Sequence, residues 1–219
     1  MRIRVLGSSA GGGFPQWNCN CPNCDGLRRC TLTARARTQS SIAVSENSLD
    51  WLLVNASPDI LTQIRDNPEL QPARSIRDSG IAAVLLMDAQ IDHVTGLLML
   101  RERKTPLPLL ATPEVFSDIG SGFPITGILS HYCDTARQEL PIDGSAVSIP
   151  ALPGLQLQTV SLSSKPPPYS PFRGNPRPGD NIGMLITNPV NGAKAFYAPG
   201  LAELTPDLIA LMSGCAVVL

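Results

Sequence analysis

The feature that most constrains the fold is a nearly continuous apolar run from Ile81 to Met87. A strand that is apolar at consecutive positions is buried on both faces, which is typical of central strands in α/β proteins. The run ends in a polar turn, Asp88 to Gly96, and residues 94–103 then show helical spacing. This pattern predicts a layered α/β domain.

Other stretches predict the remaining elements from their periodicity and turn residues. Strands are expected at residues 2–6, 40–44, 50–54, 109–112, 145–149, 155–161, 184–187, 193–197 and 215–219. Helices are expected at residues 58–67 and 206–212, and another begins near residue 112. Residues 165–178 hold six prolines, so a loop joining two strands of one sheet is expected there.

The composition argues against several classes of protein. The net charge is −1 and no long run of one sign occurs, so nothing indicates nucleic-acid binding. No segment approaches the roughly 18–20 apolar residues of a membrane span, so membrane insertion is not expected. The apolar N-terminal run is too short for a signal peptide, and we expect a cytoplasmic protein with reduced thiols. The glycine-rich segment 7–13 has neither the P-loop pattern nor the dinucleotide-binding pattern, so nucleotide binding is not expected.

Cys19, Cys21 and Cys24 form a CxCxxC pattern. Zn²⁺ binds four donors in a tetrahedron with Zn–S distances of about 2.3 Å, and one tight loop can supply three of them. Pro22 restricts the backbone between these cysteines. Six randomly placed cysteines would rarely give this spacing, so we favour zinc over three free thiols. No general base accompanies the cluster, which indicates a structural site.

The pattern leaves the fourth zinc ligand open. Cys30, Asp25 and a distant histidine are the candidates. Cys133 and Cys215 belong to no motif, and we interpret them as ordinary buried thiols.

The polar turn after the apolar run carries Asp88, Gln90, Asp92 and His93. Strand ends that face a helix N-terminus are where α/β folds bind their ligands. A second interpretation is purely structural: Asp88 or Asp92 caps the helix, and His93 packs against it. The residues alone therefore leave both interpretations open.

This turn resembles the motif Thr-His-x-His-x-Asp-His-x-x-Gly of the metallo-β-lactamase superfamily. Asp92, His93 and Gly96 match it, while Asp88 and Gln90 stand where its first two histidines belong. The resemblance implies an α/β fold, a four-layer αββα sandwich, with residues 1–219 in a single domain. The cysteine loop is also similar to a phosphodiesterase of phosphonate metabolism in this superfamily, which implies a late histidine as fourth zinc ligand.

Further runs resemble the B-protein family of pyrroloquinoline quinone (PQQ) biosynthesis over essentially the whole chain: GSSAGGGFPQWNCNCPNC, ARTQSSIAVS, LLVNASPDI, LLMDAQIDHVTGLLMLRE and GDNIGMLI. The resemblance implies a non-haem Fe²⁺- and O₂-dependent hydroxylase that acts on the tyrosine ring of a Glu-Tyr-derived intermediate. Members of this family usually lack a cysteine at the position of Cys30, which weakens that residue as a ligand.

The departures from the superfamily motif bear on the chemistry. Replacing two histidines by Asp88 and Gln90 removes most of the first ion site of a two-metal hydrolase. The second ion keeps Asp92 and His93, and a carboxylate with imidazole and open positions is typical of non-haem iron oxygenases. Asp88 and Gln90 are expected to bind the metal weakly, to hold a bound water or to hold substrate.

Two other functions remain open. One is a carrier that moves PQQ or its precursor towards the periplasm, and the other is a phosphodiesterase-like metal hydrolase. Turnover with O₂ would indicate the hydroxylase. Binding of PQQ without turnover would indicate the carrier, and cleavage of a phosphodiester would indicate the hydrolase.

His131 is interpreted as an ordinary packed or surface residue, because it belongs to no motif. The proline-rich loop 165–178 is expected to border the active site, and its Arg173 and Arg177 are candidates for contacts with substrate carboxylates.

The last apolar run stops at Leu219, where the superfamily resemblance implies a strand that continues towards an acidic residue. No histidine follows His131. We therefore expect that the C-terminal part of the domain is missing and that the active-site metal is held weakly. An uncovered strand edge would then favour a homo-oligomer.

Overall fold

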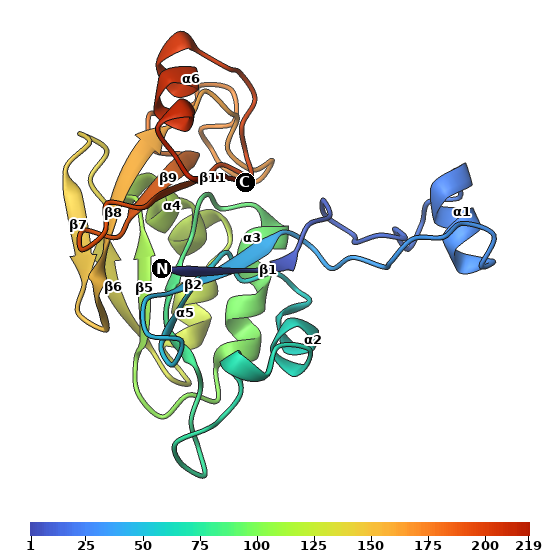
Figure 1. The fold of residues 1–219 in the computed structure, drawn as a ribbon, viewed down its shortest axis with the longest axis horizontal. Coiled ribbons are helices and arrows are strands. Elements are labelled where there is room, and N and C mark those ends of the chain that lie inside the picture. Colours follow the sequence, from blue (N-terminus) through green and yellow to red (C-terminus); the bar gives the residue numbers. More distant parts are fainter.

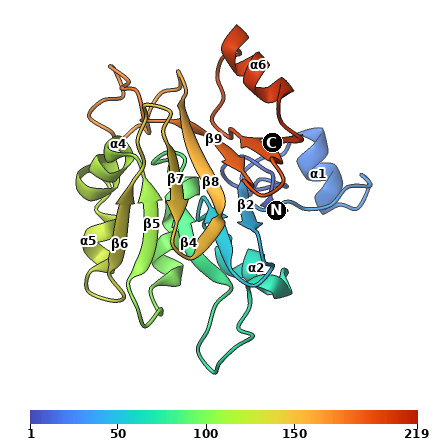
Figure 2. The same ribbon diagram turned by 60° about the vertical axis from the view of Figure 1, so that its left-hand side comes forward.

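The computed structural model describes all residues from 1 to 219. Two β-sheets pack face to face, and helices lie on the outer face of each sheet (Figure 1, Figure 2). The structure therefore has the four-layer αββα arrangement that the superfamily resemblance implies.

The first sheet has six strands in the order β1-β2-β3-β4-β5-β6. Their bounds are β1 (Arg2–Gly7), β2 (Ser41–Ser45), β3 (Trp51–Val54), β4 (Ile81–Leu85), β5 (Leu107–Ala111) and β6 (Thr135–Glu139). The first three strands are antiparallel, and β3 to β6 run parallel. β4 ends before Met87 because the Met87 N–H donates to the side-chain oxygen of Asn55 instead of to a neighbouring strand.

The second sheet has five strands in the order β11-β10-β9-β8-β7. Their bounds are β7 (Ala146–Ile149), β8 (Leu152–Ser161), β9 (Ile182–Thr187), β10 (Lys194–Tyr197) and β11 (Val217–Val218). The expected hairpin is confirmed by the antiparallel pairing of β9 with β10. The proline-rich segment 165–178 contains no strand or helix and joins β8 to β9, as expected.

The helices are short. Their bounds are α1 (Pro22–Arg28), α2 (Ile60–Arg65), α3 (Ile91–Val94), α4 (Pro113–Ser117), α5 (Ile125–Leu129) and α6 (Pro206–Ser213), with 3₁₀ turns η1 (Pro68–Leu70) and η2 (Thr95–Leu100) and a π-helical turn η3 (Asp118–Gly122). None of them has both the length and the apolar character needed to cross a membrane.

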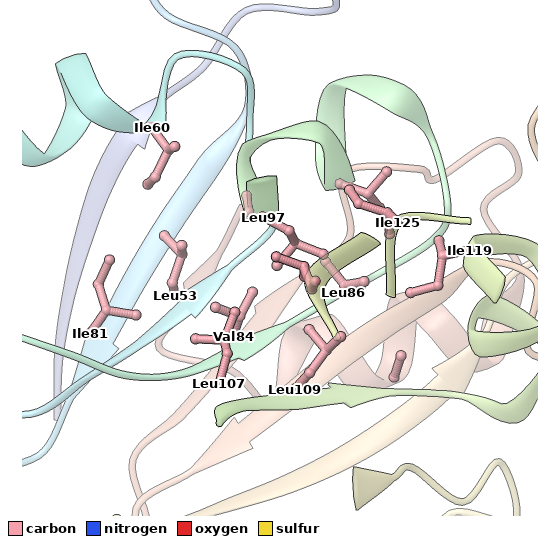
Figure 3. Close-up of a cluster of buried hydrophobic side chains, with 14 of the residues drawn as sticks. Leu53, Ile60, Ile81, Val84, Leu86, Leu97, Leu107, Leu109, Ile119 and Ile125 are labelled. Carbon is pink, nitrogen blue, oxygen red and sulfur yellow. The ribbon is translucent and has the colours of Figure 1, made fainter. Parts of the chain in front are cut away.

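Three hydrophobic clusters hold the layers together. The largest, with 22 buried residues, lies between the first sheet and its helices, and Leu53, Leu86 and Leu97 point into it from different elements (Figure 3). A second cluster of 17 residues fills the space between the two sheets. A third cluster, around Phe196 and Leu208, lies between the second sheet and α6.

Some elements differ from the sequence expectation. Residues 94–103 were expected to form one helix, but the structure has the end of α3 followed by η2. The helix is interrupted because the Gly96 N–H donates to the Ala56 carbonyl across the fold. The sequence did not predict β6, whose side chains are mostly exposed, because it carries no apolar alternation and forms by pairing with β5.

Residues 10–37 form an extension that we call the arm, with α1 near its tip, well away from the sheets (Figure 1). A bridge between Phe14 and Arg37 joins its two sides, and residues 28–37 are all exposed. The only buried residues of the arm are Cys24 and Gly26. The arm therefore gains little stability from apolar burial.

Candidate metal and ligand site

A cavity of about 620 Å³ opens beyond the end of β4, where the two sheets meet. All four residues predicted from the polar turn line it: Asp88, Gln90, Asp92 and His93. The other walls come from the glycine-rich loop, β2, the start of the proline-rich loop and segments of the second sheet that include Asn181 and Tyr197. The last residue, Leu219, also lines this cavity.

The polar turn is fixed between the two sheets by backbone hydrogen bonds. The Ile182 N–H donates to the Met87 carbonyl, and Asp88 forms an isolated bridge with Asn181. Gln90 is the residue before α3, so the turn leads directly into a helix that starts with Ile91. The cavity is therefore built at a junction of both sheets.

Asp88 and His93 form the most direct polar contact in the cavity. Oδ1 of Asp88 lies 2.7 Å from Nδ1 of His93, and both side chains are buried. The same oxygen accepts a hydrogen bond from the Gln90 backbone N–H. A carboxylate in this position fixes the orientation of the imidazole and leaves Nε2 as the nitrogen available to a metal. Orientation of His93 is therefore the role that the geometry favours for Asp88, and it was not among the roles expected from the sequence.

Asp92 and His93 fit part of a metal site. Asp92 is partly exposed to the cavity, and none of its side-chain atoms hydrogen-bonds another protein group. One carboxylate and one imidazole are two of the three donors that non-haem iron oxygenases use. No third His, Cys, Asp or Glu of the chain completes a compact group with them.

The carboxylates near His93 also affect its charge. Burial alone would lower the pKa of His93, but Asp88 and Asp92 outweigh this effect, so the pKa is raised above its usual value. Both carboxylates thus favour a cation at this point of the cavity.

The wall opposite the polar turn was not predicted from the sequence. The Tyr197 hydroxyl lies 2.9 Å from Oγ of Ser40, and burial raises the pKa of Tyr197 to about 12, so its hydroxyl stays protonated at neutral pH. Asn181 donates to the Ser164 carbonyl. The GDNIGMLI run, which contains Asn181, was the one available signal, because it resembles the B-protein family.

The proline-rich loop borders the cavity, as expected. Lys165 lines the cavity, and the Tyr169 hydroxyl donates to the carbonyl of Ala89 within the polar turn. Arg173 and Arg177, however, do not line it. Arg177 pairs with Asp180 at 2.8 Å, and Arg173 donates to the Pro166 carbonyl. These arginines hold the loop together and do not face the cavity.

Gly96 has a packing role in this region. A Cβ atom at this position would lie 2.1 Å from the carbonyl oxygen of Ser57 and 2.7 Å from that of Ala56. Backbone atoms cannot move away easily, so only glycine fits between the start of η2 and the segment after β3.

We expect Gly96→Ala to destabilise the protein by about 1–3 kcal/mol or more, the usual cost of overpacking. The measurement is urea unfolding followed by circular dichroism. Gly127→Ala in α5 is the matched control, because no atom lies within 4 Å of its added Cβ. Equal stability of the two variants would contradict the packing role of Gly96.

The predicted cysteine cluster is brought together in the arm. The Sγ atoms of Cys19, Cys21 and Cys24 all lie within 4.8 Å of one another. Tetrahedral zinc with bonds of about 2.3 Å needs sulfurs roughly 3.8 Å apart, so the three thiols fit three of its positions. Hydrogen bonds from the Cys24 backbone N–H and the neighbouring thiols lower the pKa of Cys21 to about 7. This favours the metal-binding thiolate form of Cys21, whereas burial and the neighbouring thiols raise the pKa of Cys24.

The structure does not support the proposed fourth ligands. Cys30 and Asp25 lie outside the compact group of thiols, and Asp25 pairs with Arg29 at 2.8 Å. Cys30 is displaced because the chain turns through a left-handed residue after α1, where its φ is 58°. No histidine belongs to the group either.

The remaining predictions on single residues can be placed as well. His131 is exposed near the end of α5 and does not line the cavity. Cys133 is buried, as expected, whereas Cys215 is only partly buried and its thiol contacts the Leu211 carbonyl.

Comparison with known proteins agrees with the class that this fold and site define. A model described as a beta-lactamase superfamily domain matches residues 50–219, which is more than half of the chain. Coenzyme PQQ synthesis protein B of Cupriavidus necator is 60% identical over 217 residues, 99% of this chain and 71% of the relative. The same protein of Azoarcus sp. is 55% identical over 219 residues, all of this chain and 72% of the relative.

A solved structure gives the same result. The crystal structure of Zn²⁺-bound PqqB from Methylobacterium extorquens superimposes with a TM-score of 0.86 at 36% identity, covering 100% of this chain and 71% of that one. A diphosphatase of the PhnP family shares the fold with a TM-score of 0.67 at 15% identity, covering 99% of this chain and 72% of that one. The chain is thus a member of the β-lactamase superfamily. Within it, the chain belongs to the coenzyme PQQ synthesis protein B family.

Proposed function

We propose that this chain acts in PQQ biosynthesis as a metal- and O₂-dependent hydroxylase of the tyrosine ring of a Glu-Tyr-derived intermediate. The observation that carries the proposal is the pair Asp92 and His93 in one cavity, with the histidine oriented by Asp88. A redox-active divalent ion such as Fe²⁺ held by these residues would supply one-electron chemistry with O₂.

The chain's own residues would bind and orient the substrate. The cavity is large enough for one small molecule, since typical sites have about 300–1,000 Å³. Lys165 and the neutral hydroxyl of Tyr197 line it and can donate hydrogen bonds to carboxylate or carbonyl oxygens of a PQQ precursor. The apolar side chains of Val5 and Ile42 provide contacts for its ring.

Asp88 also argues against the hydrolase. In a two-metal hydrolytic site, neutral imidazoles bind the first metal ion. Asp88 stands in place of one of these histidines, and its Oδ1 atom contacts His93 and the Gln90 backbone N–H instead. We therefore expect no β-lactam or phosphodiester hydrolysis above background, with or without added zinc.

The test is turnover of the Fe²⁺-loaded protein, purified without oxygen, on a cross-linked Glu-Tyr intermediate with O₂ and ascorbate as reductant. Mass spectrometry should show a product that has gained one oxygen atom, and His93→Ala should abolish it. Binding of PQQ without turnover would favour the carrier. Phosphodiester cleavage that disappears in His93→Ala would favour the hydrolase.

Asp88→Asn should weaken Fe²⁺ binding by about 10- to 100-fold, because removing a carboxylate that supports a metal-binding histidine has effects of this size. Anaerobic titration calorimetry measures the Fe²⁺ affinity of both proteins. Asp66→Asn is the control, since Asp66 is exposed and pairs only with Arg65. Unchanged affinity in Asp88→Asn would show that its contact with His93 does not support the metal.

For the arm, we propose a structural Zn²⁺ on Cys19, Cys21 and Cys24. The support is the proximity of the three sulfurs and the lowered pKa of Cys21. The three thiolates would fix the loop at the start of α1, which the two buried residues of the arm cannot do.

A further inference from the structure

A second cavity, of about 710 Å³, lies at the opposite end of the first sheet from the candidate metal site. It opens where β4 and β5 begin, at Ile81 and Leu107, whereas the polar turn follows the other end of β4. Its floor is apolar, because Leu70, Ile81 and Leu107 are almost fully buried. Neither the metal site nor the arm uses this cavity.

The rim of the cavity carries cations that form no ion pair. Arg103 donates to the Ile81 carbonyl at 2.9 Å and to Thr105 at 3.3 Å, which leaves three of its five N–H donors free. No carboxylate lies within ion-pair distance of Arg103, Arg77 or Lys104. Burial lowers the pKa of Arg103, and the more distant charges of Cys133 and Asp78 offset this only in part.

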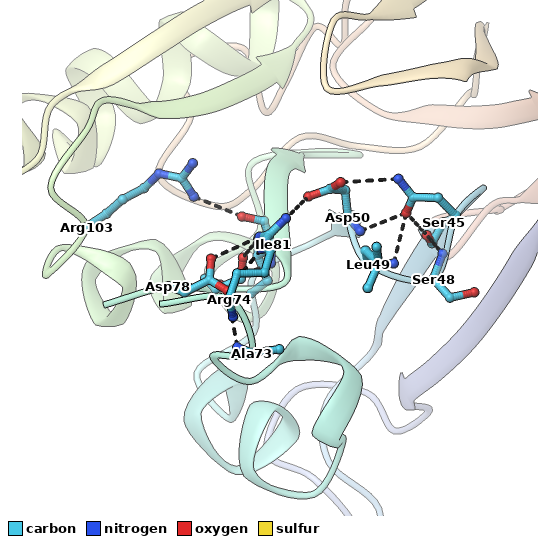
Figure 4. Close-up of polar contacts among 11 residues, drawn as sticks. Ser45, Ser48, Leu49, Asp50, Ala73, Arg74, Asp78, Ile81 and Arg103 are labelled. Atoms are coloured by element: carbon cyan, nitrogen blue, oxygen red, sulfur yellow. Dashed lines mark hydrogen bonds and ion pairs between the residues drawn. The ribbon is translucent and has the colours of Figure 1, made fainter. Parts of the chain in front are cut away.

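The carboxylates around the cavity, by contrast, all pair with an arginine, and two of them share Arg74. Asp50 lies 2.6 Å and Asp78 3.0 Å from Arg74 (Figure 4). Glu102 pairs with Arg101 at 3.6 Å. Four cations and three carboxylates line the cavity, so its net charge is +1, and the cations without an ion-pair partner are Arg77, Arg103 and Lys104.

The segment 72–79 covers one side of the cavity and is held in place by the contacts of Arg74 with Asp50 and Asp78. Asp78 accepts hydrogen bonds from the backbone N–H groups of Ala73 and Arg74 as well as from the Arg74 side chain (Figure 4). Ile76, at the tip of this segment, is 99% exposed and lies at the mouth. An apolar ligand would cover side chains that otherwise face water.

We propose that this cavity is a second ligand site, which binds a small amphipathic carboxylate. The apolar part of the ligand packs on Leu70, Ile81 and Leu107, and its carboxylate accepts hydrogen bonds from the free donors of Arg103, with Lys104 close by. Arginine suits this role because its planar group binds a carboxylate through two parallel hydrogen bonds. The volume is that of a site for one small molecule.

The probe for the test is naphthalene-2-carboxylate, with naphthalene-2-methanol as its neutral counterpart. Titration followed by protein NMR should give saturable binding of the carboxylate, with shifts at Gly80, Ala82 and Thr105. Arg103→Gln should weaken this binding about tenfold or more, as expected for lost hydrogen bonds to a charged group. The matched control is Arg2→Gln, because Arg2 is exposed in β1, forms no ion pair and does not line the cavity.

Ala82→Leu provides a second variant that changes no charge. Ala82 lines the cavity, and the larger side chain should reduce binding by filling it. This variant decides the question if Arg103→Gln does not fold. Equal binding of the neutral alcohol, unchanged affinity in Arg103→Gln, full binding by Ala82→Leu, or no saturable binding would each overturn the proposal.

Discussion

Replacing Cys24 by serine is expected to abolish tight zinc binding and to unfold the arm, while the four-layer body stays folded. Cys24 is the buried member of the cluster, and its loss leaves two sulfurs. Structural zinc sites bind with about 10–16 kcal/mol, and this energy is folding energy for the segment that carries the metal. The three hydrophobic clusters of the body contain no residue of the arm.

Elemental analysis gives the zinc content, which should fall from about one ion per chain to almost none. Limited trypsin digestion reports on the arm, where Arg28, Arg29 and Arg35 should be cut much faster in the variant. Cys30→Ser is the control, because Cys30 lies in the same arm but outside the cluster. Full zinc content in Cys24→Ser, or a body that unfolds with the arm, would contradict this expectation.

Leu53→Ala should destabilise the body by about 2–5 kcal/mol, the range observed for buried leucines that leave a cavity. Leu53 is completely buried in β3 and faces the cluster between the first sheet and its helices (Figure 3). Domains of this size are stable by only about 5–15 kcal/mol, so the change removes a large part of the total.

Urea denaturation measures this free energy. Leu49→Ala is the comparison, since Leu49 is 59% exposed in the turn before β3 and its truncation should cost less than about 0.5 kcal/mol. A cost below about 1 kcal/mol for Leu53→Ala would mean that neighbouring side chains close the cavity or that this cluster contributes little.

Much of the fold could be predicted because its central strands have strong sequence signals. The run that contains β4 is apolar at successive positions, and the hairpin of β9 and β10 has clear turn residues. The edge strand β6 has neither signal, because most of its side chains face water and its stability comes from backbone pairing with β5. Whether such a strand forms depends on the strand beside it, so the local sequence does not predict it.

The candidate site was predictable only on one side. Asp88, Gln90, Asp92 and His93 follow one strand, so a local motif brings them together. The opposite wall comes from residues far apart in the chain, such as Ser40 and Tyr197, whose contact spans 157 positions. The contact of Asp88 with His93 was also not predictable, because it depends on side-chain orientation in the folded turn.

The bridge between Asp88 and Asn181 has a consequence for how the site could be assembled from fragments. Every strand of the first sheet lies before residue 140, and every strand of the second sheet lies after residue 145. A chain cut between these positions would yield two pieces, one with Asp92 and His93 and the other with Asn181 and Tyr197. Neither piece would contain the whole cavity. A ligand that contacts both walls would therefore bind only after the two fragments have reassociated, and its binding would measure how well they reassociate.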